Sequence, residues 1–93
     1  MENETKELAK TDTAIEIMAA MRSTRITRLA LENNKVPELQ DTEYIARLEK
    51  ELDILNIERY LMYKGDKVVR EKILTEYSKE ITEYFKGKNN VSR

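Results

Sequence analysis

The sequence predicts an all-α protein: a three-helix antiparallel bundle, or a helical hairpin with a preceding helix, which we expect to form a dimer. Three observations lead to this prediction. The 93 residues include only two glycines and one proline, so few positions interrupt a helix. Apolar residues recur at helical spacing, without the alternation that strands show. The few breaks divide most of the chain into three segments of about 20 residues each.

The first predicted helix spans residues 13–33. Thr13 and Glu16 have the spacing of a capping box, in which each side chain satisfies a free backbone N–H of the first turn. Pro37 prevents the helix from continuing through the next connection. Residues 1–11 are mostly polar, and we interpret them as a flexible N-terminal lead-in. Residues 12–87 then form one helical domain, because a chain of this length supports a single core.

The second predicted helix spans residues 41–64 and begins at Asp41, a residue type that caps helix N-termini. Apolar residues at three- and four-residue spacing form a narrow seam along it, made of Ile45, Leu48, Leu52, Leu55 and Met62. A second apolar row lies about 100° away and consists of Ile54, Ile57 and Leu61, with Tyr60 and Tyr63 beside it. A helix that is apolar over so much of its circumference is normally buried on several sides.

The third predicted helix spans residues 66–86. Gly65 suits the left-handed conformation that ends a helix, and Asp66 suits the cap of the next one. Its apolar residues form one broad face, made of Val69, Ile73, Leu74, Tyr77, Ile81, Tyr84 and Phe85. Gly87 is predicted to end the helix, which leaves residues 88–93 as a flexible tail.

The chain contains neither cysteine nor histidine, which excludes disulfides, thiolate nucleophiles, zinc sites and imidazole acid–base chemistry. We therefore expect no catalytic residue, no cofactor and no metal, and we do not expect an enzyme. No stretch of about 18 consecutive apolar residues occurs, so we expect no association with membranes. The lack of cysteine fits a reducing compartment, and we expect a cytoplasmic protein. The formal net charge of −1 predicts no bulk attraction to nucleic acid.

Three arginines, Arg22, Arg25 and Arg28, stand at three-residue spacing and line one flank of the first helix. Such a stripe could follow a phosphate backbone or bind an acidic protein surface. The simpler interpretation is that the arginines pair with the second helix, because residues 38–53 contain six acidic side chains. The near-neutral net charge favours this pairing over nucleic-acid binding, for which a basic excess is usual.

The apolar surface of the second and third helices has two interpretations. All of it can belong to the core of a three-helix bundle. Alternatively, three helices cannot cover both apolar rows, and the surplus forms a dimer interface or a docking site, where tyrosines are common. On the second interpretation, the predicted partner-binding residues are Arg22, Arg25, Arg28, Ile57, Tyr60, Leu61, Tyr63 and Tyr84.

One local resemblance involves the stretch from Leu29 to Leu39, LALENNKVPEL. It resembles the end of the inhibitory helix of Fic-toxin antitoxins, where Ser or Thr is followed after three residues by Glu and then Gly or Asn. Glu32 and Asn33 match that motif, but its hydroxyl position is Arg28 here. The match covers about a tenth of the chain, so the antitoxin function is not carried over.

These features predict a small helical interaction protein, a homodimer that binds and modulates a larger protein as a regulator, inhibitor, antitoxin or assembly factor. The composition, rich in Lys, Glu, Ile and Asn, suggests a bacterial or phage accessory protein. One alternative is a nucleic-acid-binding regulator that uses Arg22, Arg25 and Arg28. Another is a structural or scaffolding subunit, which would dimerise without a further partner.

Overall fold

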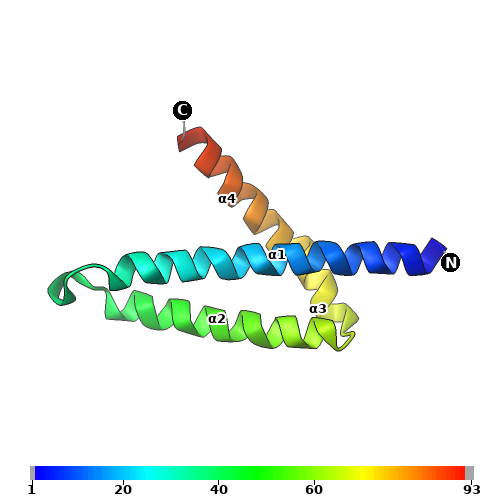
Figure 1. The fold of residues 1–93 in the computed structure, drawn as a ribbon, viewed down its shortest axis with the longest axis horizontal. Coiled ribbons are helices and arrows are strands. Elements are labelled where there is room, and N and C mark those ends of the chain that lie inside the picture. The colour runs from blue at the N-terminus through cyan, green and yellow to red at the C-terminus, as the bar shows by residue number, and fades with distance from the viewer. Residues whose placement is uncertain (1, 92–93) are drawn as a thin grey trace.

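The computed structural model describes the backbone of residues 2–91 and the side chains of residues 5–87. The described chain is all-α, which confirms that part of the predicted fold class. Its elements are α1 (Glu2–Asn33), the 3₁₀ turn η1 (Pro37–Leu39), α2 (Thr42–Tyr63), α3 (Lys67–Lys72), the π-helical segment η2 (Ile73–Tyr77) and α4 (Ser78–Val91) (Figure 1). None of the helices within this part of the chain is both long and apolar enough to cross a membrane.

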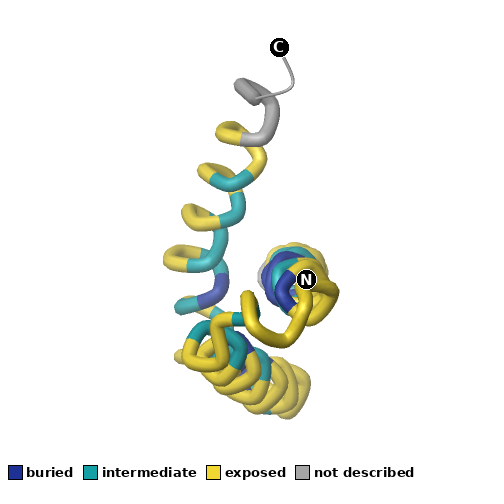
Figure 2. Tube along the Cα trace, turned by 90° about the vertical axis from the view of Figure 1, so that its left-hand side faces the viewer, coloured by how far each residue is buried: buried dark blue, intermediate teal, exposed yellow. Residues whose placement is uncertain are grey.

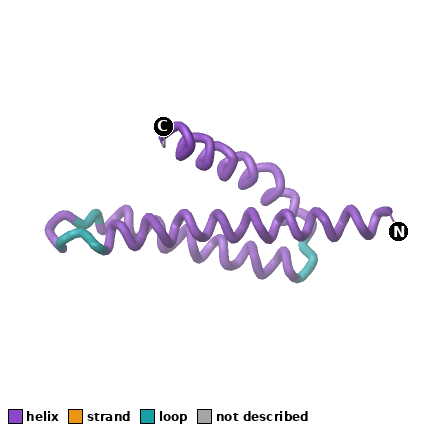
Figure 3. Tube along the Cα trace, turned by 45° about the horizontal axis from the view of Figure 1, so that its top comes forward, coloured by secondary structure: helices purple, strands orange, loops and turns teal. Residues whose placement is uncertain are grey.

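The helices α1 and α2 lie side by side as an antiparallel hairpin (Figures 1 and 3). The continuous helix formed by α3, η2 and α4 crosses this hairpin near the middle of α1, and the C-terminal end of α4 points away from it. The radius of gyration is 15.8 Å, whereas a compact domain of this length has about 12 Å. The molecule is therefore open and flat, and much side-chain surface faces solvent.

The first helix begins at Glu2, well before the predicted start at Thr13. Thr13 does not cap a helix, because its hydroxyl donates to the carbonyl oxygen of Ala9 one turn earlier. The predicted lead-in consists largely of good helix formers. It also contacts α3, since Oε2 of Glu7 forms an ion pair with Nη2 of Arg70 at 2.5 Å. This contact with a distant segment is one that the local sequence pattern could not indicate.

The connection between α1 and α2 is organised by Glu32, a buried carboxylate at the end of α1. Its Oε2 accepts the backbone N–H of Asp41 at 2.8 Å, and its Oε1 pairs with Lys35 at 3.0 Å. The hydrogen bond from Asp41, with help from Lys35, lowers the pKa of Glu32. Asp41 in turn caps α2 by accepting from the backbone N–H of Tyr44, which confirms the predicted cap.

The third helix begins as predicted but differs from the prediction in its interior and at its end. Gly65 has φ +96° and Asp66 accepts the backbone N–H of Val69, as predicted for the turn and the cap. The helix itself contains the π-helical segment η2, which no periodicity in the sequence indicates. It also continues past Gly87 to Val91, because a glycine inside a helix costs only about 1 kcal/mol. Of the predicted flexible tail, residues 92–93 lie outside the described residues.

The core is small and rich in methionine. Its buried members come from three helical segments and are Ala14, Met18, Met21, Leu55, Met62 and Ile73. The predicted seam of α2 contributes Leu55 and Met62 to this core. Of its other members, Leu48 is buried, and Ile45 and Leu52 are half-buried. Figure 2 shows that burial is confined to the inner sides of the helices, while most of α2 is exposed.

Candidate functional site

An apolar row runs along one flank and the solvent side of α2, away from the seam that packs on α1. We call it the outer face and define it as Ile54, Ile57, Tyr60 and Leu61. Ile57 and Tyr60 are each 59% exposed, Ile54 is also exposed, and Leu61 is half-buried. The interpretation that all of this row belongs to the core is therefore wrong for the single chain.

Two tyrosine rings of α2 are held at the surface by neighbouring cations. The ammonium nitrogen of Lys64 lies 5.4 Å from the centre of the Tyr60 ring, and the guanidinium carbon of Arg59 lies 6.0 Å from the centre of the Tyr63 ring. Each of these contacts joins residues four apart on the helix, which are neighbours on its surface. The rings are thus restricted before any partner arrives, which lowers the entropy cost of burying them.

Arg25, predicted as the centre of a binding stripe, is instead buried within the chain, with 8% of its surface exposed. Its Nη2 lies 3.0 Å from Glu51 of α2 and its Nη1 lies 2.7 Å from Glu80 of α4. Burial alone would lower the pKa of Arg25, but the hydrogen bonds and charges of Glu80 and Glu51 raise it overall. Arg25 therefore joins three helices and does not present its charge to solvent.

The other two arginines are half-buried on α1. The guanidinium carbon of Arg28 lies 5.7 Å from the centre of the Tyr84 ring, and Tyr84 packs edge to face on Phe85. Arg22 has a buried Nε with no hydrogen-bond partner among the described residues. The structure thus brings Arg28 and Tyr84 together but separates both from the outer face of α2.

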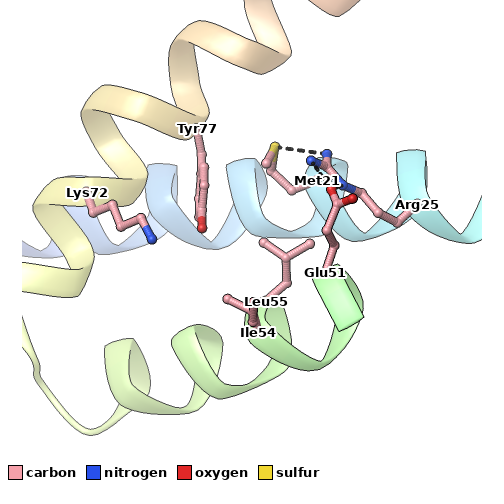
Figure 4. Close-up of a pocket in the computed structure, with 7 residues that line it drawn as sticks. All are labelled: Met21, Arg25, Glu51, Ile54, Leu55, Lys72 and Tyr77. Atoms are coloured by element: carbon pink, nitrogen blue, oxygen red, sulfur yellow. Dashed lines mark hydrogen bonds and ion pairs between the residues drawn. The ribbon is translucent and has the colours of Figure 1, made fainter. Parts of the chain in front are cut away.

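A cleft of about 290 Å³ lies between the hairpin and the third helix. Figure 4 shows the side chains that line it, which are Met21, Arg25, Glu51, Ile54, Leu55, Lys72 and Tyr77. Ile54 belongs to both the cleft and the outer face. The two cations of the cleft are already paired with carboxylates of the chain, Arg25 as described and Lys72 with Glu58.

Glu58 is the buried carboxylate that links α2 to the third helix. Its Oε2 lies 2.6 Å from Nζ of Lys72, and its Oε1 accepts a hydrogen bond from the hydroxyl of Tyr77. The hydrogen bond to Glu58 raises the pKa of Lys72. Burial, followed by the hydrogen bond to Glu58, raises the pKa of Tyr77. These groups stabilise the crossing of the helices, and their mutual pairing leaves little charge for a ligand.

Sequence reasoning did not identify Glu58 as part of this network. The available signal was its spacing, because Leu55, Glu58 and Met62 stand at i, i+3 and i+7 on the side of α2 that packs inward. An acidic residue at such a position needs a paired donor. Comparison with protein-family models, curated proteins and solved structures finds no match for this chain.

Proposed function

We propose that this chain is a small protein–protein interaction module that uses the outer face of α2 to bind and modulate another protein. One observation carries the proposal: Ile57 and Tyr60 stand side by side, each more than half exposed, on a regular helix. Single exposed apolar residues are ordinary. An adjoining isoleucine and tyrosine with apolar neighbours on the same face are typical of the centre of a protein interface.

The energetics favour a modest but useful binding contribution. Full burial of an isoleucine or a similar side chain stabilises by about 1.5–3 kcal/mol. Because Ile57 and Tyr60 are about half exposed, roughly half of this free energy is still to be gained when a partner covers each of them, and smaller amounts remain for Ile54 and Leu61. A partner that covers all four gains about 4 kcal/mol on this scale before paying the cost of association. Further contacts at a polar rim would supply the rest of the binding free energy.

The mode of action fits steric occlusion or adaptor binding. The outer face lies on a helix of 22 residues that is capped at its start and packed along its other side. Such a surface requires little ordering when a partner docks. We therefore expect binding to change the partner by covering part of its surface.

The nucleic-acid alternative depends on the three arginines. The pairing of Arg25 with Glu51 and Glu80 counts against it, because a guanidinium held by two carboxylates is not available to phosphate. The contact of Arg28 with Tyr84 also occupies that side chain in part. Protein binding through α2 is therefore the better-supported candidate.

The proposal is tested by measuring partner binding with the variant Ile57→Ser/Tyr60→Ser. Val68→Ser is the matched control, because Val68 is an exposed apolar residue on α3, outside the outer face. We expect the double variant to lose binding and the control to retain it, with little dependence on salt. Loss of binding on Arg22→Glu/Arg28→Glu, with a steep salt dependence, would instead support the nucleic-acid alternative.

A further inference from the structure

We infer that a second copy of this chain covers the outer face, with the two α2 helices antiparallel and Asp53 of each copy paired with Lys64 of the other. This inference rests on the proposed function, because it names the first protein that the outer face binds. It follows from the spacing, the exposure and the charges of four residues: Asp53, Ile57, Tyr60 and Lys64.

These four residues form one stripe along the solvent side of α2. Their spacing of four, three and four residues is the spacing that aligns side chains in helix pairs. All four are exposed. The two apolar residues stand at the centre, an acid stands at one end and a base at the other.

The stripe is complementary to itself when it is reversed. Read backwards it is Lys, Tyr, Ile and Asp, with the same spacing. In an antiparallel pair, Ile57 of each copy therefore meets Tyr60 of the other, and Asp53 of each copy meets Lys64 of the other. A two-fold axis makes each of these contacts twice, as expected for a homodimer.

Charge also disfavours the other arrangements. A parallel pair would place Asp53 against Asp53 and Lys64 against Lys64, which is repulsive. An antiparallel pair centred on Ile57 would place Lys50 against Lys64. Only the register that pairs Ile57 with Tyr60 combines an apolar centre with opposite charges at both ends of the stripe.

The two charges are available for this contact. In the part of the chain that the structure describes, Asp53 has no ion-pair partner, and Lys64 lies over the ring of Tyr60. The carboxylates on the inner side of α2, Glu51 and Glu58, are paired within the chain. The formal net charge of −1 adds little repulsion between two copies.

The length of the stripe sets the expected strength. From Asp53 to Lys64 it extends about 16 Å at 1.5 Å per residue. Such a contact is smaller than a standard interface, which buries about 800 Å² on each partner. We therefore expect a weak, reversible dimer.

Sedimentation of the full chain between about 1 μM and 1 mM tests the inference, with charge reversal as the probe. Asp53→Lys alone and Lys64→Glu alone each create two repulsive pairs. We expect each single variant to raise the dissociation constant of the dimer about tenfold or more. The double variant Asp53→Lys/Lys64→Glu restores both pairs, and we expect it to dimerise within about threefold of the original chain. Asp12→Lys, the same change at an exposed position of α1, should have no effect.

A strictly monomeric chain, a dimer that ignores both single reversals, or a double variant that fails to recover would each overturn the inference. Circular dichroism at 222 nm verifies that every variant remains helical. If the chain is monomeric while Ile57→Ser/Tyr60→Ser still abolishes binding to another protein, self-association is refuted and the proposed function stands. If the chain is monomeric and Ile57→Ser/Tyr60→Ser leaves binding to the other protein intact, the proposed function fails as well.

Discussion

Replacing Arg25 with methionine should measure how strongly the buried ion pairs hold the three helices together. Methionine retains an unbranched apolar side chain, so it preserves the packing of the Arg25 stem, while the weak contact of Nη1 with Sδ of Met21 is lost. It removes the two ion pairs, to Glu51 at 3.0 Å and to Glu80 at 2.7 Å, together with the hydrogen bond from Nη1 to the hydroxyl oxygen of Thr24. The perturbation is therefore mainly electrostatic.

The magnitude follows from the exposure of the two carboxylates. A hydrogen bond to a charged group contributes about 1.5–3 kcal/mol when it is buried, and an exposed ion pair at most about 1 kcal/mol. The side chains of Glu51 and Glu80 are 36% and 48% exposed, so both regain water when Arg25 is lost. We take about 1 kcal/mol for each pair and expect a total loss of about 2 kcal/mol in the free energy of unfolding.

Urea denaturation followed by circular dichroism at 222 nm provides the assay. The midpoint should fall while the slope m stays unchanged, since the same surface is exposed on unfolding. Arg28→Met is the control, because its contact with the ring of Tyr84 contributes only about 0.5–1 kcal/mol. A loss below about 0.5 kcal/mol for Arg25→Met, or one equal to that of the control, would refute the reasoning.

Three further predictions concern the turn and the titrating groups. Gly65→Ala should lower the free energy of unfolding by about 1 kcal/mol, because φ is +96° there, and an unchanged urea midpoint would contradict this. Because the pKa of Glu32 is lowered in the fold, its contribution to stability is present above the unfolded pKa of about 4.3 and is lost as pH falls. At pH values below about 4.5 the urea midpoint should therefore decrease, and it should decrease less for Glu32→Gln. Because the pKa of Lys72 is raised in the fold, its contribution to stability is present below about pH 10.4 and is lost as pH rises further. Lys72→Met should therefore reduce the alkaline decrease of the urea midpoint. An equal decrease in both proteins would count against the pair with Glu58.

The helical class and the inner seam of α2 could be predicted from the sequence because both depend on local spacing. The caps at Asp41 and Asp66 could likewise be predicted from the sequence, since a capping side chain acts on residues two or three positions away. The early start of α1 was not readable in the same way. The N-terminal part of α1 makes an ion pair from Glu7 to Arg70, which lies more than 60 positions away along the chain.

The candidate site was predicted in part. The apolar row of Ile54, Ile57 and Leu61 was recognisable because it exceeds what one helix needs to pack on its neighbours. Pairing of Arg25 with the second helix was one of the alternatives that the sequence left open, but its contact with Glu80 depends on how the third helix crosses α1. That crossing includes the π-helical segment Ile73–Tyr77, and crossing geometry of this kind is set by tertiary packing.

Site-directed photo-crosslinking at the outer face tests the central claim most directly. A photoreactive phenylalanine analogue replaces Tyr60 in one protein and the exposed Glu16 of α1 in another, and both are illuminated in extracts of cells that produce the chain. We expect discrete protein adducts from position 60, including a cross-linked pair of chains, and none from position 16. Equal adduct yields at the two positions, or no adduct at position 60, would contradict the claim that the outer face of α2 is a protein-binding surface.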